Sequence, residues 1–183
     1  MSEATPYTID RYIYRRYIGA MNATGAFSTL VIAVATLAAS VTDSAAQRQP
    51  DFSGTWVLNR QASSLPPPVS AVESGVLRIE HREPSFSFHR TYVIGGAPRE
   101  ASFTVLTDGR ETSETGAKGL TTISTLRWAS DALVLAMRIQ GPGFTATNDV
   151  RYELLNSGTR LRATEQGRSP QGDHDAVWIY DRQ

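Results

Sequence analysis

The segment that decides the fold is Asp51-Phe52-Ser53-Gly54-Thr55-Trp56-Val57-Leu58-Asn59, DFSGTWVLN. A Gly54-x-Trp56 element at the start of an apolar, β-favouring run is typical of the first strand of a small antiparallel β-barrel. Residues 52–59 are therefore predicted to form that strand. The element is short, so the fold prediction also depends on the chain that follows.

Short strands separated by turn signals follow along the rest of the chain. Residues 61–74 predict a loop, because prolines 66–68 cannot donate to a β-ladder, and Gly95-Gly96 and Asp108-Gly109 are typical of hairpin turns. The short connections predict an all-β, antiparallel up-and-down β-barrel of about 8–10 strands, with a rolled sheet as the alternative. The predicted strands are 52–59, 75–82, 85–94, 101–107, 111–115, 120–129, 133–140, 145–155, 159–167 and 173–181.

Residues 1–46 are predicted to be a signal peptide, followed by one barrel domain over residues 51–183. An apolar run at 26–41 lies between three arginines (11, 15 and 16) and the small residues Ser44-Ala45-Ala46. The run is short for a membrane span. This predicts a periplasmic or secreted protein with no stable membrane anchor after cleavage. An uncleaved anchor, a start at Met1 or Met21, and Sec or twin-arginine export remain open.

Composition narrows the classes of function. The chain of 183 residues has 18 basic and 18 acidic side chains and no cysteine. Without cysteine there is no disulfide framework and no thiolate nucleophile. The balanced charge, with no basic block, argues against a nucleic-acid partner. No feature of the sequence indicates an oligomeric state.

A resemblance extends over residues 51–181. DFSGTWVLN behind a leader resembles secreted bacterial lipocalin-like proteins, as do LRIEHREP (77–84), TDGRE (107–111), RWASDALVL (127–135) and VWIY (177–180). The resemblance implies a lipocalin-like barrel whose bottom is closed by Gly54 and Trp56. It also implies that an arginine, Arg182 or Arg151, stacks on the Trp56 ring.

Candidate ligand-binding residues come from strands with a period of two. In 85–94 an arginine shares a face with three aromatic residues, and in 75–82 a histidine shares a face with two aliphatic residues. The arginine, Arg90, either pairs internally with Glu153 or Glu165 or binds an anionic head group. The predicted lining residues are His81, Phe86, Phe88, Arg90, Tyr92, Trp128 and Tyr152.

The histidines do not predict a metal site. His81 and His89 fall on opposite faces of neighbouring strands, whereas zinc needs three or four converging ligands. His174, in Asp173-His174-Asp175, is interpreted as a solvated residue where the last strand begins. No cofactor is predicted, and no serine lies in a nucleophile elbow. The inward face of the last strand is left open between Ala176, Trp178 and Tyr180 on one side and Val177 and Ile179 on the other.

The sequence therefore predicts a binding protein that holds a small apolar or amphipathic molecule inside a barrel. Two other classes remain. A barrel enzyme of isomerase or hydrolase type would need titratable groups that converge in a cavity. A filled barrel with a structural or interaction role would have no cavity, because eight-stranded barrels can be packed solid.

Overall fold

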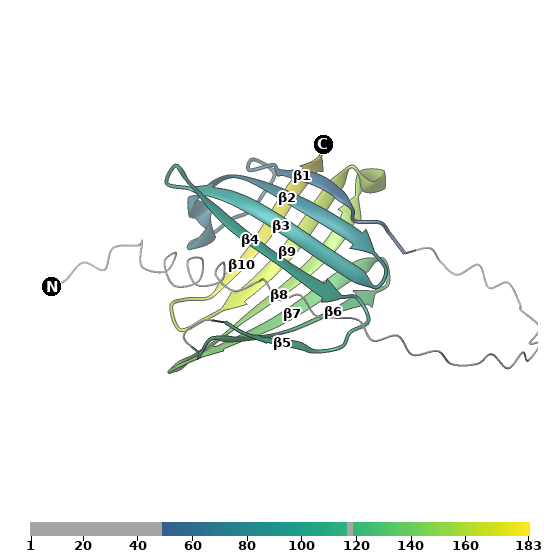
Figure 1. Ribbon diagram of the computed structural model, residues 1–183. Coiled ribbons are helices and arrows are strands. Elements are labelled where there is room, and N and C mark those ends of the chain that lie inside the picture. The colour runs from purple at the N-terminus through teal and green to yellow at the C-terminus, as the bar shows by residue number, and fades with distance from the viewer. Residues whose placement is uncertain (1–48, 117–118) are drawn as a thin grey trace, which may run out of the picture.

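The computed structural model describes residues 49–116 and 119–183, so the predicted leader lies outside the described residues. These residues form one ten-stranded antiparallel sheet that curls into a barrel (Figure 1). Two short 3-10 helices, η1 and η3, cover Val69–Ala71 and Asn156–Gly158. The strands are β1 (Gly54–Leu58), β2 (Val72–Arg82), β3 (Ser85–Ile94), β4 (Ala97–Leu106), β5 (Thr112–Thr115), β6 (Thr121–Ala129), β7 (Ala132–Gly141), β8 (Phe144–Leu155), β9 (Arg160–Arg168) and β10 (His174–Arg182).

The strand order confirms the predicted up-and-down meander. Nine neighbouring pairs hold the sheet in the order β4-β3-β2-β1-β10-β9-β8-β7-β6-β5. Eight pairs are consecutive in the chain, and the ninth joins β1 to β10, with Trp56 opposite Arg182. The edge strands β4 and β5 do not pair with each other. An isolated bridge joins Asp108, just after β4, to Arg127 of β6, so the barrel is nearly closed.

The strand positions agree closely with the sequence prediction. The strand predicted at 85–94 has those bounds in the structure. The next strand begins at Ala97, four residues before the prediction, because Ala97 pairs with Ile94 directly across the Gly95-Gly96 turn. Neither 3-10 helix was predicted. Within the described residues, no helix is long and apolar enough to cross a membrane.

The last strand shows which of its faces points inward. Trp178 and Tyr180 are 4% and 2% exposed and belong to the main core cluster, together with Ala176. Ile179 is also buried, but it lies on the other face, where its backbone N–H bonds Ser63 Oγ of the β1–β2 connection. This loop therefore covers the outer face of β10, which explains why both faces of the strand are apolar in the sequence.

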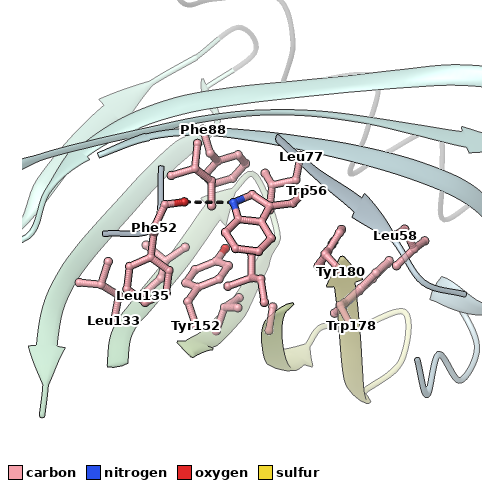
Figure 2. Packing of buried hydrophobic residues seen from close by; sticks show 14 of the residues in the cluster. Phe52, Trp56, Leu58, Leu77, Phe88, Leu133, Leu135, Tyr152, Trp178 and Tyr180 are labelled. Carbon is pink, nitrogen blue, oxygen red and sulfur yellow. Dashed lines mark hydrogen bonds between the residues drawn. The ribbon is translucent and has the colours of Figure 1, made fainter. Parts of the chain in front are cut away.

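The main core fills the end of the barrel where β1 begins. Figure 2 shows Trp56 in this packing, between Leu77 and Tyr152, with its indole N–H directed at Phe52. Phe52 and Trp56 are completely buried. We call this end of the barrel the closed half. The inward residues buried there are Phe52, Trp56, Phe86, Val105, Leu126, Leu133, Leu135 and Leu161.

The inner face changes character along the strands. In β6 the inward residue Leu126 is buried, whereas Ser124, two residues nearer the opposite end, is partly exposed. In β7 the same change from buried to partly exposed occurs between Leu135 and Met137. Met137 is the cross-strand partner of Ser124. We call this second part of the inner face the open half. Its partly exposed inward residues are Arg90, Ile94, Arg99, Ala101, Phe103, Thr122, Ser124, Met137, Asn148 and His174.

Candidate functional site

Trp56 closes one end of the barrel through two polar contacts. Its buried indole Nε1–H donates to the carbonyl oxygen of Phe52 at 3.0 Å. The Arg182 guanidinium carbon lies 4.2 Å from the centre of the Trp56 ring, so Arg182 is the predicted arginine that contacts it. Gly54 has φ +141°, and a Cβ there would lie 3.1 Å from Arg182 Nη1. The positive φ favours glycine at this position beside the stacked pair.

Glu83 organises a second polar cluster at the closed end. Its carboxylate accepts hydrogen bonds from His81 Nε2 at 2.9 Å, Trp128 Nε1 at 2.7 Å and Thr107 Oγ1 at 2.5 Å. The backbone N–H of Phe52 is directed at His81 Nδ1, 3.4 Å away. In this arrangement Nδ1 is the acceptor and Nε2 the donor. Both ring nitrogens of His81 thus have hydrogen-bond partners within the protein.

The Glu83 cluster should make the barrel sensitive to acid. Burial raises the pKa of Glu83, but hydrogen bonds from Thr107, His81 and Trp128 outweigh burial and hold it below its ordinary value of 4.5. A carboxyl group whose pKa is lower in the folded than in the unfolded protein stabilises the fold at pH values above its unfolded-state pKa. This stabilisation is lost as the pH falls through its folded-state pKa. We expect Glu83→Gln to lower the free energy of unfolding by about 1 kcal/mol at neutral pH. The effect is small because Glu83 is half exposed.

The measurement is urea unfolding at neutral and acid pH. The difference between the wild type and Glu83→Gln should shrink as the pH falls, because both carry an uncharged side chain in acid. Glu80→Gln is the matched control, since Glu80 is exposed on the outer face of β2. A cost of Glu83→Gln that does not change with pH would contradict the assigned role of the charge.

An aromatic group lies between the two halves of the barrel. The rings of Tyr92 and Trp178 stack with centroids 5.1 Å apart and an interplanar angle of 6°. The hydroxyl groups of Tyr92 and Tyr180 are hydrogen-bonded at 2.5 Å. Burial raises the pKa of both tyrosines, and that of Tyr152, above the ordinary value of 10.0. These three phenols are therefore protonated at neutral pH and supply hydrogen-bond donors, not charge.

Arg90 lies on the inner face, as the period of two predicted. Its guanidinium lies 5.1 Å from the Tyr92 ring centre and 5.9 Å from that of Phe88. Of the two carboxylates considered as its partners, Glu153 is bound by Arg151 and Arg162 instead. Glu165 is buried, and the positive charge of Arg90 helps to lower its pKa. Of these two carboxyl groups, Glu165 is thus the one whose pKa is lowered by the charge of Arg90.

Glu165 is a buried, ionised carboxylate on β9. Burial raises its pKa most strongly, but contact with His174, the charge of Arg90 and the Trp178 indole together leave the pKa below its ordinary value. Trp178 Nε1–H donates to Glu165 Oε2 at 2.5 Å. His174 Nε2 lies 3.9 Å from the same oxygen, beyond hydrogen-bond reach.

His174 turns its ring inward over a glycine. Gly167 faces His174 across the β9–β10 pair, and a Cβ on Gly167 would lie 2.1 Å from the imidazole Cε1. The imidazole therefore occupies the space that a side chain at position 167 would fill. The interpretation of His174 as a solvated residue at the start of the strand was wrong, because only 15% of its side chain is exposed.

The predicted lining residues fall in two places. His81, Phe86, Trp128 and Tyr152 lie at the closed end, where aromatic contacts join Phe86 to both His81 and Tyr152. Phe88, Arg90 and Tyr92 lie further along β3, toward the open half. Arg99, Asn148 and His174 also face the interior but were not predicted to line a site. For His174, the signal available was Gly167, a glycine inside a strand without a turn to explain it.

No group of three histidine, aspartate or glutamate side chains among the described residues could hold a metal ion. On the inner face, arginine, histidine, amide and phenol groups lie next to apolar side chains. The closed half of the barrel is thus a packed core, and the open half has partly exposed polar and apolar side chains next to a second, small buried cluster of Leu120, Ile139 and Ala146.

The fold is similar to that of several solved structures. A REP1-NXSQ fatty acid transporter has 18% sequence identity and a TM-score of 0.47, covering 72% of this chain and 96% of its own. A zebrafish ileal bile acid-binding protein complexed with cholic acid has 16% identity and a TM-score of 0.45, covering 72% and 98%. The fatty-acid-binding protein of Manduca sexta has 19% identity and a TM-score of 0.41, covering 72% and 99%. Neither a protein family nor a curated protein matches the sequence.

Proposed function

We propose that this protein is an exported, lipocalin-like binding protein that holds a small amphipathic molecule in the open half of its barrel. The observation that carries the proposal is the change along the inner face. Leu126 and Leu135 are 0% and 2% exposed, whereas Ser124 and Met137, each two residues further along, are partly exposed. One half of the barrel is thus a packed core. Beyond it, the inner face is partly exposed up to a second, smaller buried cluster of Leu120, Ile139 and Ala146.

The residues of the open half suit an amphipathic molecule. Phe103, Met137 and Ile94 are partly buried and pack against the main core, so they offer apolar surface next to a solid floor. Covering such surface with a ligand contributes roughly 25 cal/mol per Å² before the costs of association. Arg90 and Asn148 add polar groups on the same face, and these would orient a ligand that has a polar end.

Binding can be tested with anilinonaphthalene sulfonate, a fluorescent amphipathic probe. We expect saturable binding to the mature protein, at least about tenfold weaker in Ser124→Trp because an indole would occupy the open half. Thr125→Trp is the matched control, since Thr125 is the next residue of β6 and faces outward. Absence of saturable binding, or equal binding by the two variants, would refute an internal site.

Export is proposed from the apolar run and the small residues of the leader. The protein recovered from the periplasm or medium of its host should begin after Ala46. Recovery of the full-length chain from the membrane fraction would contradict a cleaved signal.

A further inference from the structure

The two edge strands of the sheet, β4 and β5, meet along one side of the barrel. Within the described residues no ladder of hydrogen bonds joins them, although β4 pairs with β3 and β5 pairs with β6 along their other sides. Figure 1 shows β4 and β5 diverging from the connection between them. We call this unpaired junction of β4 and β5 the seam.

The seam is fastened at the closed end of the barrel. The Gly109 N–H donates to the carbonyl oxygen of Leu126 at 2.9 Å. The Glu83 carboxylate accepts from both Thr107 and Trp128, so it also ties the end of β4 to β6. Further toward the open half, β4 and β5 can separate without breaking a ladder. Separation of any of the nine paired neighbours would break one.

The exposed part of the inner face follows the seam. On β4 the inward residues Arg99 and Phe103 are partly exposed, and on β6, behind the short strand β5, Ser124 is partly exposed as well. On β9, which lies far from both edges in the strand order, the inward residues Glu165 and Gly167 are buried. Solvent therefore contacts the inner face of the open half chiefly from the side where the sheet is unpaired.

Apolar packing covers the end of the open half in two places. Around the β7–β8 turn, Ile139 and Ala146 are both 8% exposed and form the second buried cluster, with Phe144 packed against it. Where β2 begins, Val72 is 3% exposed and belongs to the main core cluster together with Leu65 of the β1–β2 connection. The end of the barrel is thus better sealed at these places than the seam is along its side.

We infer that the seam is the entrance of the barrel, so that a ligand reaches and leaves the open half sideways, between β4 and β5. This inference rests on the proposed function and adds the route to that site. Phe103 and Ser124 lie on the two sides of the route, so a passing amphipathic molecule meets both an apolar and a polar side chain. The contacts of Glu83 hold the closed end while the seam widens, so passage leaves the packed core intact.

The test ties the two sides of the seam together with a cross-link, which is specific because the chain has no cysteine of its own. In the double variant Ser102→Cys/Ser113→Cys, one thiol lies on the exposed outer face of each edge strand, and a bis-maleimide joins the two. Stopped-flow fluorescence measures the association and dissociation rates of anilinonaphthalene sulfonate before and after cross-linking. We expect both rates to fall by about tenfold or more and Kd to stay the same, because a narrower entrance slows passage equally in both directions.

The matched control is Ser87→Cys/Thr104→Cys, joined by the same reagent. Ser87 and Thr104 are cross-strand partners on β3 and β4, with their hydroxyl oxygens 2.7 Å apart, so a link between these paired strands should leave both rates unchanged. Unchanged rates after cross-linking of the seam would overturn the seam as the entrance. A change in only one rate would also overturn it, since the link would then act on the bound state and not on passage. Absence of saturable probe binding before cross-linking would instead refute the proposed function itself.

Discussion

Replacing Trp56 with alanine is expected to lower the free energy of unfolding by about 3–5 kcal/mol, the range for removing a large aromatic side chain from a core. Trp56 is completely buried and lies where β1 pairs with both β2 and β10. The change would leave a cavity at the closed end and remove the partner of the Phe52 carbonyl oxygen. It would also remove the ring on which Arg182 stacks.

Two further variants separate these contributions in urea unfolding. Trp56→Phe keeps a ring but loses the hydrogen bond to Phe52, so it should cost less than Trp56→Ala. Arg182→Ala removes the stacked cation and should cost about 1 kcal/mol, since Arg182 is exposed. If Trp56→Ala cost no more than Arg182→Ala, Trp56 would not be the residue that fills the closed end.

Gly75→Ala is expected to destabilise the protein by about 1–3 kcal/mol, although alanine usually suits a strand better than glycine. A Cβ at position 75 would lie 2.4 Å from Cδ1 of Tyr92, the residue opposite Gly75 in β3. Tyr92 cannot easily give way, because its ring stacks on Trp178 and its hydroxyl is bonded to Tyr180. Thermal or urea unfolding measures the change.

The sign of the effect should reverse when the tyrosine ring is absent. In a Tyr92→Leu background, Gly75→Ala should be neutral or slightly stabilising, because the smaller side chain leaves room for the new Cβ. Comparison of the four proteins in a double-mutant cycle isolates the coupling between the two positions. A cost of Gly75→Ala that is the same in both backgrounds would exclude steric conflict with Tyr92.

Much of this fold could be predicted from local sequence. Paired glycines such as Gly95-Gly96 mark hairpin turns. The alternation of apolar and polar residues in 85–94 predicted the bounds of β3 and the inward direction of Arg90. The last strand could not be resolved in this way. Ile179 is buried by the β1–β2 loop, and this long-range contact makes the outer face of β10 as apolar as its inner face.

The candidate site was harder to predict than the fold because it depends on the register between strands. His174 and Gly167 are seven residues apart in the sequence and face each other only because of how β9 pairs with β10. Asn148 joins them through a second register, that of β8 with β9. Polar residues next to a turn are usually solvated, so composition alone favoured that interpretation for His174. The aromatic residues were identified more easily, yet several of them fill the closed end.

The pairing of β1 with β10 means that the physical edges of the sheet, β4 and β5, lie in the middle of the chain. A circular permutant that joined the end of β10 to the start of β1 and opened the chain between β4 and β5 would keep every strand pair. All of its pairs would then be hairpins between consecutive strands, and its contact order would be lower. Low contact order speeds folding, so the permutant should reach the same barrel faster than the natural chain order does.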